Sequence, residues 1–243
     1  MADLAAMRLD WPDCRNARDL GGLPAGAGRR IRRRALVRSD SLDRLSAAGR
    51  RAVRAHGLTR IVDLRAADEA KLAPGPFDGE PIYRLRPLID PDADLVRDPA
   101  AEPTPAATYR ASVIRNIRNI GLGLAAIADA PDGCVLVHCA AGKDRTGMTI
   151  ALALRTVGVP ATDIAADYAF SAVCLRDQFQ AEMAAAADDE ARAHLRNLHD
   201  LAPGNILGML SRVDEAYGDI DGYLAAAGLT PIQVGRLRDR LVG

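Results

Sequence analysis

One stretch of the chain, CVLVHCAAGKDRTGMTIALAL (134–154), constrains the fold more than any other. It begins with β-branched and aliphatic residues, which are typical of a buried strand, and it ends in a helical pattern of small and aliphatic residues. A short turn of small, polar and basic residues joins the two. A strand that passes through a tight turn into a helix is the building unit of α/β sheets. The sequence therefore predicts an α/β protein with this turn at the carboxyl edge of its sheet.

Other segments predict further strands of the same sheet. Residues 60–65 (RIVDLR) and 81–89 (PIYRLRPLI) are short apolar runs that end in charge. Residues 16–40 have the turn glycines of a small β-hairpin region. The arginine run at 29–38 alternates enough to predict a strand with one solvated face. The alternative is a basic patch that attracts acidic lipid headgroups or phosphopeptides.

Helix signals lie between and after these strands. Ser46 is a suitable cap for a helix that ends near His56. Residues 90–105 are rich in Pro and Asp and predict a loop, and a helix is expected from 107 to 129. Residues 183–199 predict an exposed helix or a mobile cover.

We therefore expect one domain over residues 1–243, with a central, mostly parallel sheet flanked by helices. Its expected parts are a β-rich N-terminal region at about 14–40, an α/β core at about 41–158, and a helical C-terminal part at about 159–243 that partly covers the site.

The composition argues against several classes of protein. The 32 basic and 32 acidic residues cancel, and only 4% of residues are aromatic, so nucleic acid is not an expected partner. No apolar run reaches the roughly 18 residues of a membrane span, and no signal peptide is recognisable at the N-terminus. The four cysteines have neither disulfide nor zinc spacing, which fits a reduced, cytosolic origin. No cofactor is expected. The expected location is the cytoplasm; export without a recognisable signal peptide stays open, and the sequence does not address oligomeric state.

The turn after the strand has the chemistry of an anion site. Its backbone N–H groups lie at a helix N-terminus, where they can bind an anion. Cys139 lies at the rim, where this field favours the thiolate. Arg145 offers a planar fork for two phosphate oxygens, and Gly142 permits a tight backbone. Thr146 can hydrogen-bond the sulfur. The expected phosphate-binding residues are Ala140, Ala141, Gly142, Lys143, Asp144, Arg145 and Thr146.

The turn resembles the signature of the cysteine-dependent phosphatases, which include tyrosine, dual-specificity and inositol-lipid enzymes. The spacing C-x₅-R, the preceding His and the following Thr-Gly all agree, at His138, Cys139, Gly142, Lys143, Arg145, Thr146 and Gly147. A buried structural cysteine beside a glycine turn would have no use for the Lys-Asp-Arg sequence.

A closer resemblance extends over nearly the whole chain. The segments NARDLGGLP, LVRSDSL, GLTRIVDLRAADE, HCAAGKDRTG, ADYAFS and EAYGDIDGYLAAAGL are similar to those of bacterial phosphatases of the mycobacterial tyrosine phosphatase B type. The resemblance implies a phosphatase core with added helices that can cover the site. It also implies a metal-independent enzyme that acts on phosphotyrosine proteins and, in some members, on phosphoinositides.

Lys143 is one of only two lysines, which favours a specific role. We interpret it as a second cation at the mouth of the anion site, suited to a substrate with more than one phosphate.

Three aspartates compete for the role of general acid. Asp144 lies inside the loop, similar to the loop aspartate of myotubularin-type lipid phosphatases. Asp63 ends the strand 60–65 at the carboxyl edge of the sheet, with Arg65 as a potential partner, and Asp90 follows the strand 81–89. Asp144 is preferred and Asp63 is retained as a second catalytic candidate.

The sequence Trp-Pro-Asp at 11–13 spells the acid loop of other tyrosine phosphatases. It lies before the first expected strand, so we interpret Trp11 as a core residue and Asp13 as incidental. Cys14, Cys134 and Cys174 are expected to be structural.

The sequence thus predicts a phosphomonoester hydrolase with a cysteinyl-phosphate intermediate, most simply a protein tyrosine phosphatase, with dual-specificity or phosphoinositide activity open. The alternatives are a catalytically weak phosphate-binding module, a sulfurtransferase and an arsenate reductase. The last would need a resolving thiol, and no second cysteine lies in the loop or just after it.

Overall fold

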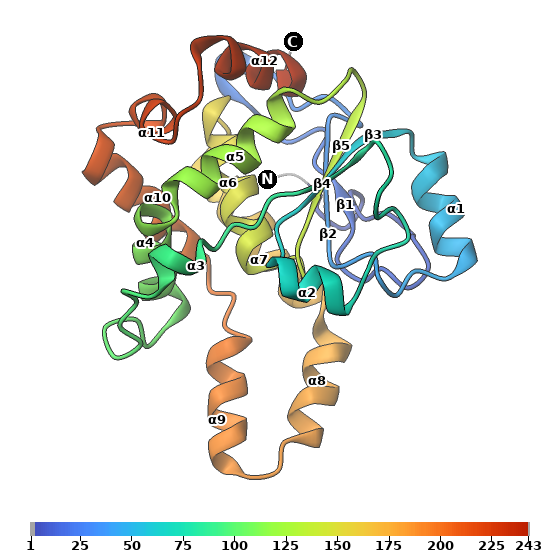
Figure 1. The fold of residues 1–243 in the computed structure, drawn as a ribbon, viewed down its shortest axis with the longest axis vertical. Helices are drawn as coiled ribbons and strands as arrows, with labels where there is room; N and C mark the ends of the chain where they lie inside the picture. The colour runs from blue at the N-terminus through green and yellow to red at the C-terminus, as the bar shows by residue number, and fades with distance from the viewer. Residues whose placement is uncertain (1–2, 243) are drawn as a thin grey trace.

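The computed structural model of the protein describes residues 3–242, and its centre is a five-stranded sheet (Figure 1). The edge strand β1 pairs antiparallel with β2, and the other three strand pairs of the sheet are parallel. The α/β architecture with a mostly parallel sheet is as the sequence predicted. In spatial order the strands are β1 (Arg18–Asp19), β2 (Leu36–Ser39), β5 (Cys134–His138), β3 (Leu58–Asp63) and β4 (Tyr83–Leu85).

The strand β5 lies in the middle of this sheet, and all five of its residues are buried. Its continuous apolar sequence reflects burial on both faces of the sheet. Residues on one face pack against α1 (Ala47–Ala55) and the side chains of Trp11 and Phe77. Residues on the other face pack against α5 (Ile117–Ala128) and α6 (Asp144–Thr156). Figure 1 shows α1 on one side of the sheet and α5 and α6 on the other.

The remaining helices cover the α6 side and the carboxyl edge of the sheet. Their bounds are α2 (Ala67–Leu72), α3 (Pro91–Asp94), α4 (Pro105–Arg115), α7 (Ala161–Cys174), α8 (Arg176–Ala185), α9 (Asp189–Leu198), α10 (Pro203–Tyr217), α11 (Ile220–Ala226) and α12 (Pro231–Val242), and a short 3₁₀ turn, η1, covers Gly26–Gly28. Among the described residues, no helix is long and apolar enough to span a membrane.

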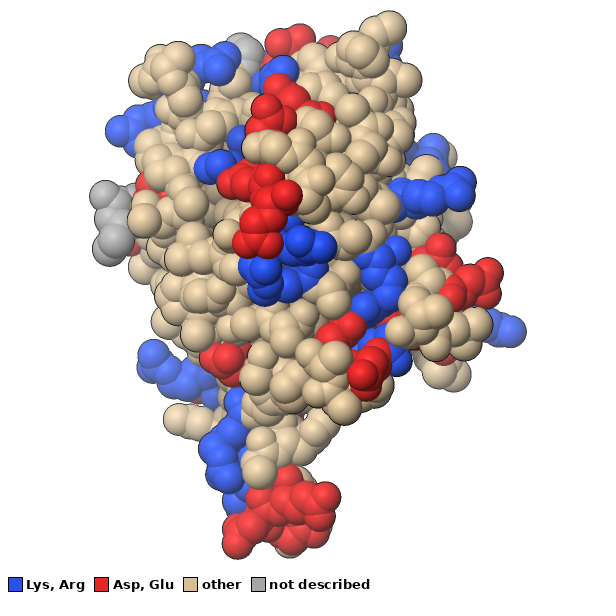
Figure 2. Space-filling model, turned by 90° about the vertical axis from the view of Figure 1, so that its left-hand side faces the viewer, with Lys and Arg blue, Asp and Glu red and all other residues tan. Residues whose placement is uncertain are grey.

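The helices α8 and α9 form a hairpin that projects from the body of the protein (Figure 1). Its tip is acidic, because Asp188 caps α9 and Asp189 and Glu190 follow in the first turn. Figure 2 shows acidic side chains gathered at the projecting end, and elsewhere on that face basic and acidic groups alternate in small clusters.

Several local predictions are confirmed. The helix α1 begins after Ser46, whose side chain accepts a hydrogen bond from the Gly49 N–H at 3.3 Å. Gly57, directly after this helix, has φ +80°, a left-handed conformation that glycine adopts without strain. The buried strand 134–138 and the helix after it are also as predicted.

The prediction of one continuous helix over 107–129 is wrong, because this segment forms two helices. It is divided into α4 and α5 at Asn116, whose backbone leaves the helical region. The Asn116 side chain donates to Ser112 and accepts a hydrogen bond from the N–H of Asp90, so it satisfies groups that a continuous helix would not reach. The predicted loop 90–105 also contains α3, which begins at Asp90 because that carboxylate accepts N–H bonds from the first turn.

The predicted strand over the arginine run 29–38 is also wrong for most of its length. Only its last residues belong to β2, and the preceding residues form turns. Arg38, within β2, is fully buried instead of facing solvent. Residues 183–199 do not form one helix but include the tip of the α8–α9 hairpin.

Candidate active site

The loop 139–143 joins the central strand β5 to α6, and so lies at the carboxyl edge of the sheet. Gly142 is required for its shape. The residue has φ +68°, and an added Cβ would lie 2.2 Å from the carbonyl oxygen of Ser39. No side chain fits there. The helix α6 begins at Asp144, so its unpaired N–H groups and its positive dipole end face the loop.

The loop is held from outside by donors that bind its carbonyl groups. The Asn16 side-chain amide donates to the carbonyls of Ala141 and Gly142, at 3.0 and 3.2 Å. The Arg38 guanidinium donates to Gly142 at 2.6 Å, and the Ser41 N–H donates to Ala140 at 2.8 Å. With its carbonyls bound on the outer side, the loop can turn its N–H groups inward, as an anion cradle requires.

These outer donors belong to a buried charge network that the sequence did not reveal. Asp167 of α7 accepts from the Nε of Arg18 at 2.6 Å and from an Nη of Arg38 at 2.5 Å, and all three side chains are buried. Burial would raise the pKa of Asp167, but the two guanidinium charges outweigh it and hold the pKa below its usual range. The loop therefore rests on a fixed, ionised support.

Cys139, the residue after β5, is buried, with 2% of its surface exposed. The Thr146 hydroxyl, in the first turn of α6, is buried and has no hydrogen-bond partner among the described residues. His138 precedes the cysteine, and burial lowers the pKa of its imidazole. Its Nδ1 lies 3.2 Å from the carbonyl oxygen of Cys139.

The other cysteines are in surroundings that suppress thiolate formation. Burial raises the pKa of Cys134 to about 12. Burial and the neighbouring Asp40 carboxylate raise the pKa of Cys14 well above its usual range. Burial also raises the pKa of Cys174. All three are free thiols. Cys134 and Cys174 are buried, and the Cys14 thiol donates a hydrogen bond to Asp40 at 2.9 Å.

The guanidinium of Arg145 is held in place by Glu69 of α2. Both carboxylate oxygens accept from it, one of them at 2.9 Å from Nη2. Burial alone would lower the pKa of Arg145, but the hydrogen bonds that its guanidinium donates to Glu69 outweigh burial and raise the pKa. Glu69 was not among the residues selected from the sequence. Its only signal was its place in the segment 57–69, which carries part of the family resemblance.

Of the three aspartates, Asp144 lies in the loop and is the first residue of α6. Its side chain is 37% exposed. One oxygen accepts from the Tyr109 hydroxyl, and both accept from the Lys143 ammonium, at 2.8 and 2.6 Å. Tyr109 remains a phenol and a donor, because burial and the Asp144 charge raise its pKa well above its usual range.

Asp63 and Asp90 have other surroundings. Asp63 is fully buried and accepts from the Arg65 guanidinium at 2.6 to 3.1 Å and from the Tyr83 hydroxyl at 2.8 Å. Burial would raise its pKa, but His138 and Arg65 hold it below the usual value. Asp90 accepts backbone N–H groups at the start of α3. Both carboxylates are bound to structural partners.

The Lys143 ammonium is buried and faces away from open solvent. Besides Asp144 it donates to the carbonyl of Leu198, the last residue of α9, at 2.9 Å. The structure thus joins the loop to the base of the α8–α9 hairpin through this lysine.

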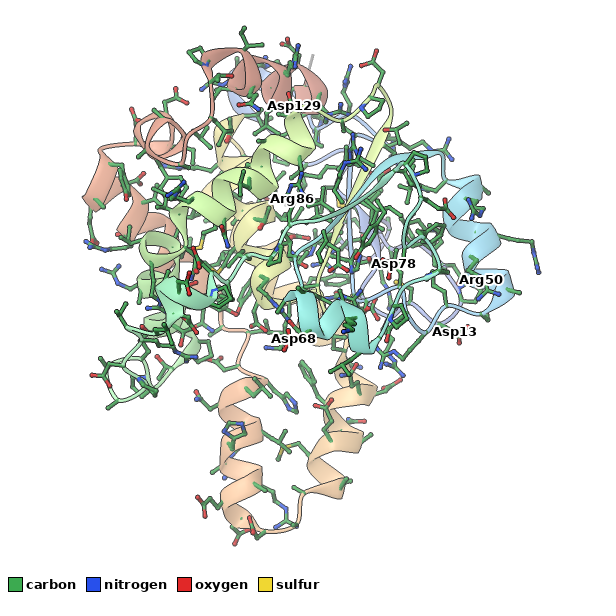
Figure 3. The ribbon with its side chains drawn as sticks, viewed as in Figure 1. Asp13, Arg50, Asp68, Asp78, Arg86 and Asp129 are labelled. Carbon is green, nitrogen blue, oxygen red and sulfur yellow. The ribbon has the colours of Figure 1, made fainter. Side chains whose placement is uncertain are left out.

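The Trp-Pro-Asp sequence contributes nothing to this site. Trp11 is buried in the core on the α1 side of the sheet, and Asp13 accepts a hydrogen bond from the N–H of Ser46. Figure 3 shows Asp13 beside the start of α1.

A cavity of about 310 Å³ lies directly beside the loop. The loop residues Ala140 and Ala141 form part of its wall, and the other lining residues are Ser41, Asp43, Arg44, Arg65, Glu69, Ala73 and Gln178. A larger cavity of about 740 Å³, between α12 and the start of β5, contains none of the loop residues. Within residues 3–242 there is no cluster of His, Cys, Asp and Glu that could hold a metal ion.

Known proteins are similar in sequence to most of this chain. The model of a tyrosine phosphatase family matches residues 9–243. The triple specificity protein phosphatase PtpB of Mycobacterium tuberculosis is 30% identical, over 96% of this chain and 99% of the relative. A tyrosine-protein phosphatase of Nostoc commune is also 30% identical, over 85% of this chain and 74% of the relative. The chain belongs to the tyrosine phosphatase family and is a protein tyrosine phosphatase.

Proposed function

We propose that this phosphatase hydrolyses phosphomonoesters through a cysteinyl-phosphate intermediate on Cys139, with phosphotyrosine as its main substrate. One observation supports it above the others. A buried cysteine, the N-terminus of α6 and the Arg145 fork converge on one loop whose carbonyls are bound from outside. This combination can hold a phosphoryl group and attack it.

In the first step the Cys139 thiolate forms a bond to phosphorus while the bond from phosphorus to the substrate oxygen breaks. The loop N–H groups and Arg145 stabilise the negative charge on the three equatorial oxygens. The departing oxygen takes a proton from Asp144. In the second step water attacks phosphorus and gives its proton to Asp144, and phosphate and the thiolate are released. The Thr146 hydroxyl, which has no described partner, is available to bind the sulfur.

The choice of Asp144 as the acid rests on its surroundings. Its carboxylate is partly exposed in the loop itself, whereas that of Asp63 is fully buried against Arg65 and Tyr83. Asp144→Asn is expected to slow turnover of phosphotyrosine about 10²-fold or more. Turnover of an aryl phosphate with a much better leaving group, such as para-nitrophenyl phosphate, should fall less, because that oxygen leaves without a proton. Equal losses on both substrates would exclude Asp144 as the acid.

The experiment that tests the proposal is phosphate release by wild type and Cys139→Ser, with a chelator present. The substrates are phosphotyrosine, phosphoserine and phosphothreonine peptides and mono- to trisphosphorylated phosphoinositides. We expect release from phosphotyrosine by wild type only, and retained vanadate binding by the variant. Persistent turnover by Cys139→Ser would refute the mechanism.

The same panel tests the wider specificity. The name of the mycobacterial relative, a triple specificity phosphatase, supports activity beyond phosphotyrosine. We include dual-specificity and phosphoinositide hydrolysis in the proposal on that basis. Four free thiols are typical of a reducing compartment, which supports action on phosphoproteins of the cytoplasm.

A further inference from the structure

The cavity beside the loop contains a cation that the mechanism does not use. Four charged residues line it: Asp43, Arg44, Arg65 and Glu69. Two of them already form ion pairs with other residues. Arg65 is held by Asp63, and Glu69 holds the fork of Arg145. Of the charged lining residues, Asp43 and Arg44 remain to meet a ligand.

The Arg44 guanidinium is available for a ligand. Its side chain is 49% exposed, and its one ionic contact with another described residue is with an oxygen of Asp40, at a distance of 3.9 Å. That carboxylate already accepts from the N–H groups of Arg15 and Asn16 and from the Cys14 thiol, at 2.9 to 3.1 Å. Within residues 3–242 no hydrogen bond to the Arg44 side chain is made, so its donors are free in a polar cavity next to the phosphate loop.

The sequence favours Lys143 as the second cation that meets the substrate. In the structure its surroundings differ from those of Arg44. Its ammonium is buried and bound by Asp144 and by the carbonyl of Leu198. A second negative group on the substrate would have to displace both partners to reach it. Arg44 requires no such displacement.

The acidic residue Asp43, which also lines the cavity, indicates which substrate fits. Asp43 adjoins Arg44 in the sequence, and one of its carboxylate oxygens is buried without a hydrogen-bond partner among the described residues. An inositol headgroup with several phosphates would meet this negative charge. A peptide presents both kinds of group, a carboxylate for the guanidinium and backbone N–H donors for Asp43.

We propose that Arg44 is a specificity-determining residue that binds the carboxylate of an acidic residue flanking the phosphotyrosine of a peptide substrate. The inference rests on the proposed function and assigns its substrate class. The guanidinium matches a carboxylate with two parallel hydrogen bonds, and the loop beside it fixes the phosphate at the same time.

The test compares two phosphotyrosine peptides that differ only in their flanking residues, Glu in one and Gln in the other. The measured quantity is the ratio of their kcat/KM values. An exposed ion pair is worth up to about fivefold, so wild type should prefer the acidic peptide by about that factor. Arg44→Ala should bring the ratio to about one, and Arg44→Glu should reverse the preference, since like charges repel. The matched control is Arg51→Ala, an exposed arginine of α1 outside the cavity, which should keep the wild-type ratio.

The outcomes separate this inference from the proposed function. Release from para-nitrophenyl phosphate tests the chemistry, whereas binding of the two peptides to Cys139→Ser tests recognition without turnover. A binding ratio that depends on Arg44 supports the inference even where release fails. Equal ratios in wild type and Arg44→Ala overturn it. A preference for polyphosphorylated inositol lipids that depends on Arg44, with no discrimination between the peptides, overturns the peptide assignment.

Discussion

Replacing Asp167 with Asn tests the idea that a buried charge network supports the phosphate loop. The Asp167 carboxylate is 1% exposed and lies between the fully buried side chains of Arg18 and Arg38. Asn preserves the volume of the side chain but removes its charge. The NH₂ group of its amide would also face two guanidinium groups, which are donors only and cannot accept a hydrogen bond. Two positive charges would then be buried without a counter-charge.

The expected loss in the free energy of unfolding is about 3–5 kcal/mol, the usual cost of removing one partner of a buried ion pair. For a domain of this size each kcal/mol lowers Tm by about 2–4 °C, so the expected fall is about 6–20 °C. The measurement is urea unfolding followed by circular dichroism. The control is Asp221→Asn, which removes the partner of Arg238 in a pair whose side chains are 56% and 41% exposed. That variant should lose less than about 1 kcal/mol.

The pH dependence provides an independent check. The pKa of Asp167 is lowered in the folded protein, so its stabilising contribution is present above the unfolded pKa of about 3.9. It is lost as the pH falls through the lower, folded value. The difference between wild type and Asp167→Asn should therefore be constant from about pH 8 to 5 and shrink only under strongly acid conditions.

A variant as stable as the control would refute the argument that this network carries stability. Because Arg38 also donates to the carbonyl of Gly142, a destabilised network should in addition lower kcat/KM. Full activity in a strongly destabilised but folded variant would show that the loop keeps its shape without this support.

Two other substitutions test the loop from inside. Glu69→Gln should lower kcat/KM about tenfold, because Arg145 loses a charge-assisted hydrogen bond that orients its fork, and steady-state kinetics measure this. A rise in kcat/KM would instead mean that Glu69 competes with the substrate phosphate. Gly142→Ala should abolish phosphate release and vanadate binding, since its Cβ would lie 2.2 Å from the carbonyl oxygen of Ser39 at φ +68°. Retained vanadate affinity in that variant would contradict the need for this backbone geometry.

The fold class and the strand–loop–helix unit could be predicted because their signals are local. The apolar run 134–138 forms β5, and the residues after it form a turn and a helix, within one continuous segment. The division of 107–129 at Asn116 could not be predicted, because the reason for it lies in a contact with Asp90. Hydrophobic periodicity and helix propensity contain no information about such a partner.

The same distinction applies to the site. Cys139 and Arg145 could be selected because the spacing between them matches the signature of the family that the chain resembles. Glu69 could not, because an acidic residue in a short surface helix has no local feature that distinguishes it from a solvated one, and the fork it holds is 76 positions away. Asp167 was hidden for a similar reason, since its partner Arg18 is separated from it by 149 positions.

Lys143 shows where local reasoning reaches its limit. The scarcity of lysine favoured a specific role for this residue, but residue type alone could not say what its ammonium contacts. The partner is the carbonyl of Leu198, 55 positions later, at a helix end that only the folded chain brings to the loop. The proposed nucleophile and the proposed phosphate-binding arginine are close in sequence, whereas the contacts that place Lys143 and Arg145 come from distant segments. Substrate specificity is therefore best sought around Arg44 and the base of the hairpin, outside the motif that identifies the family.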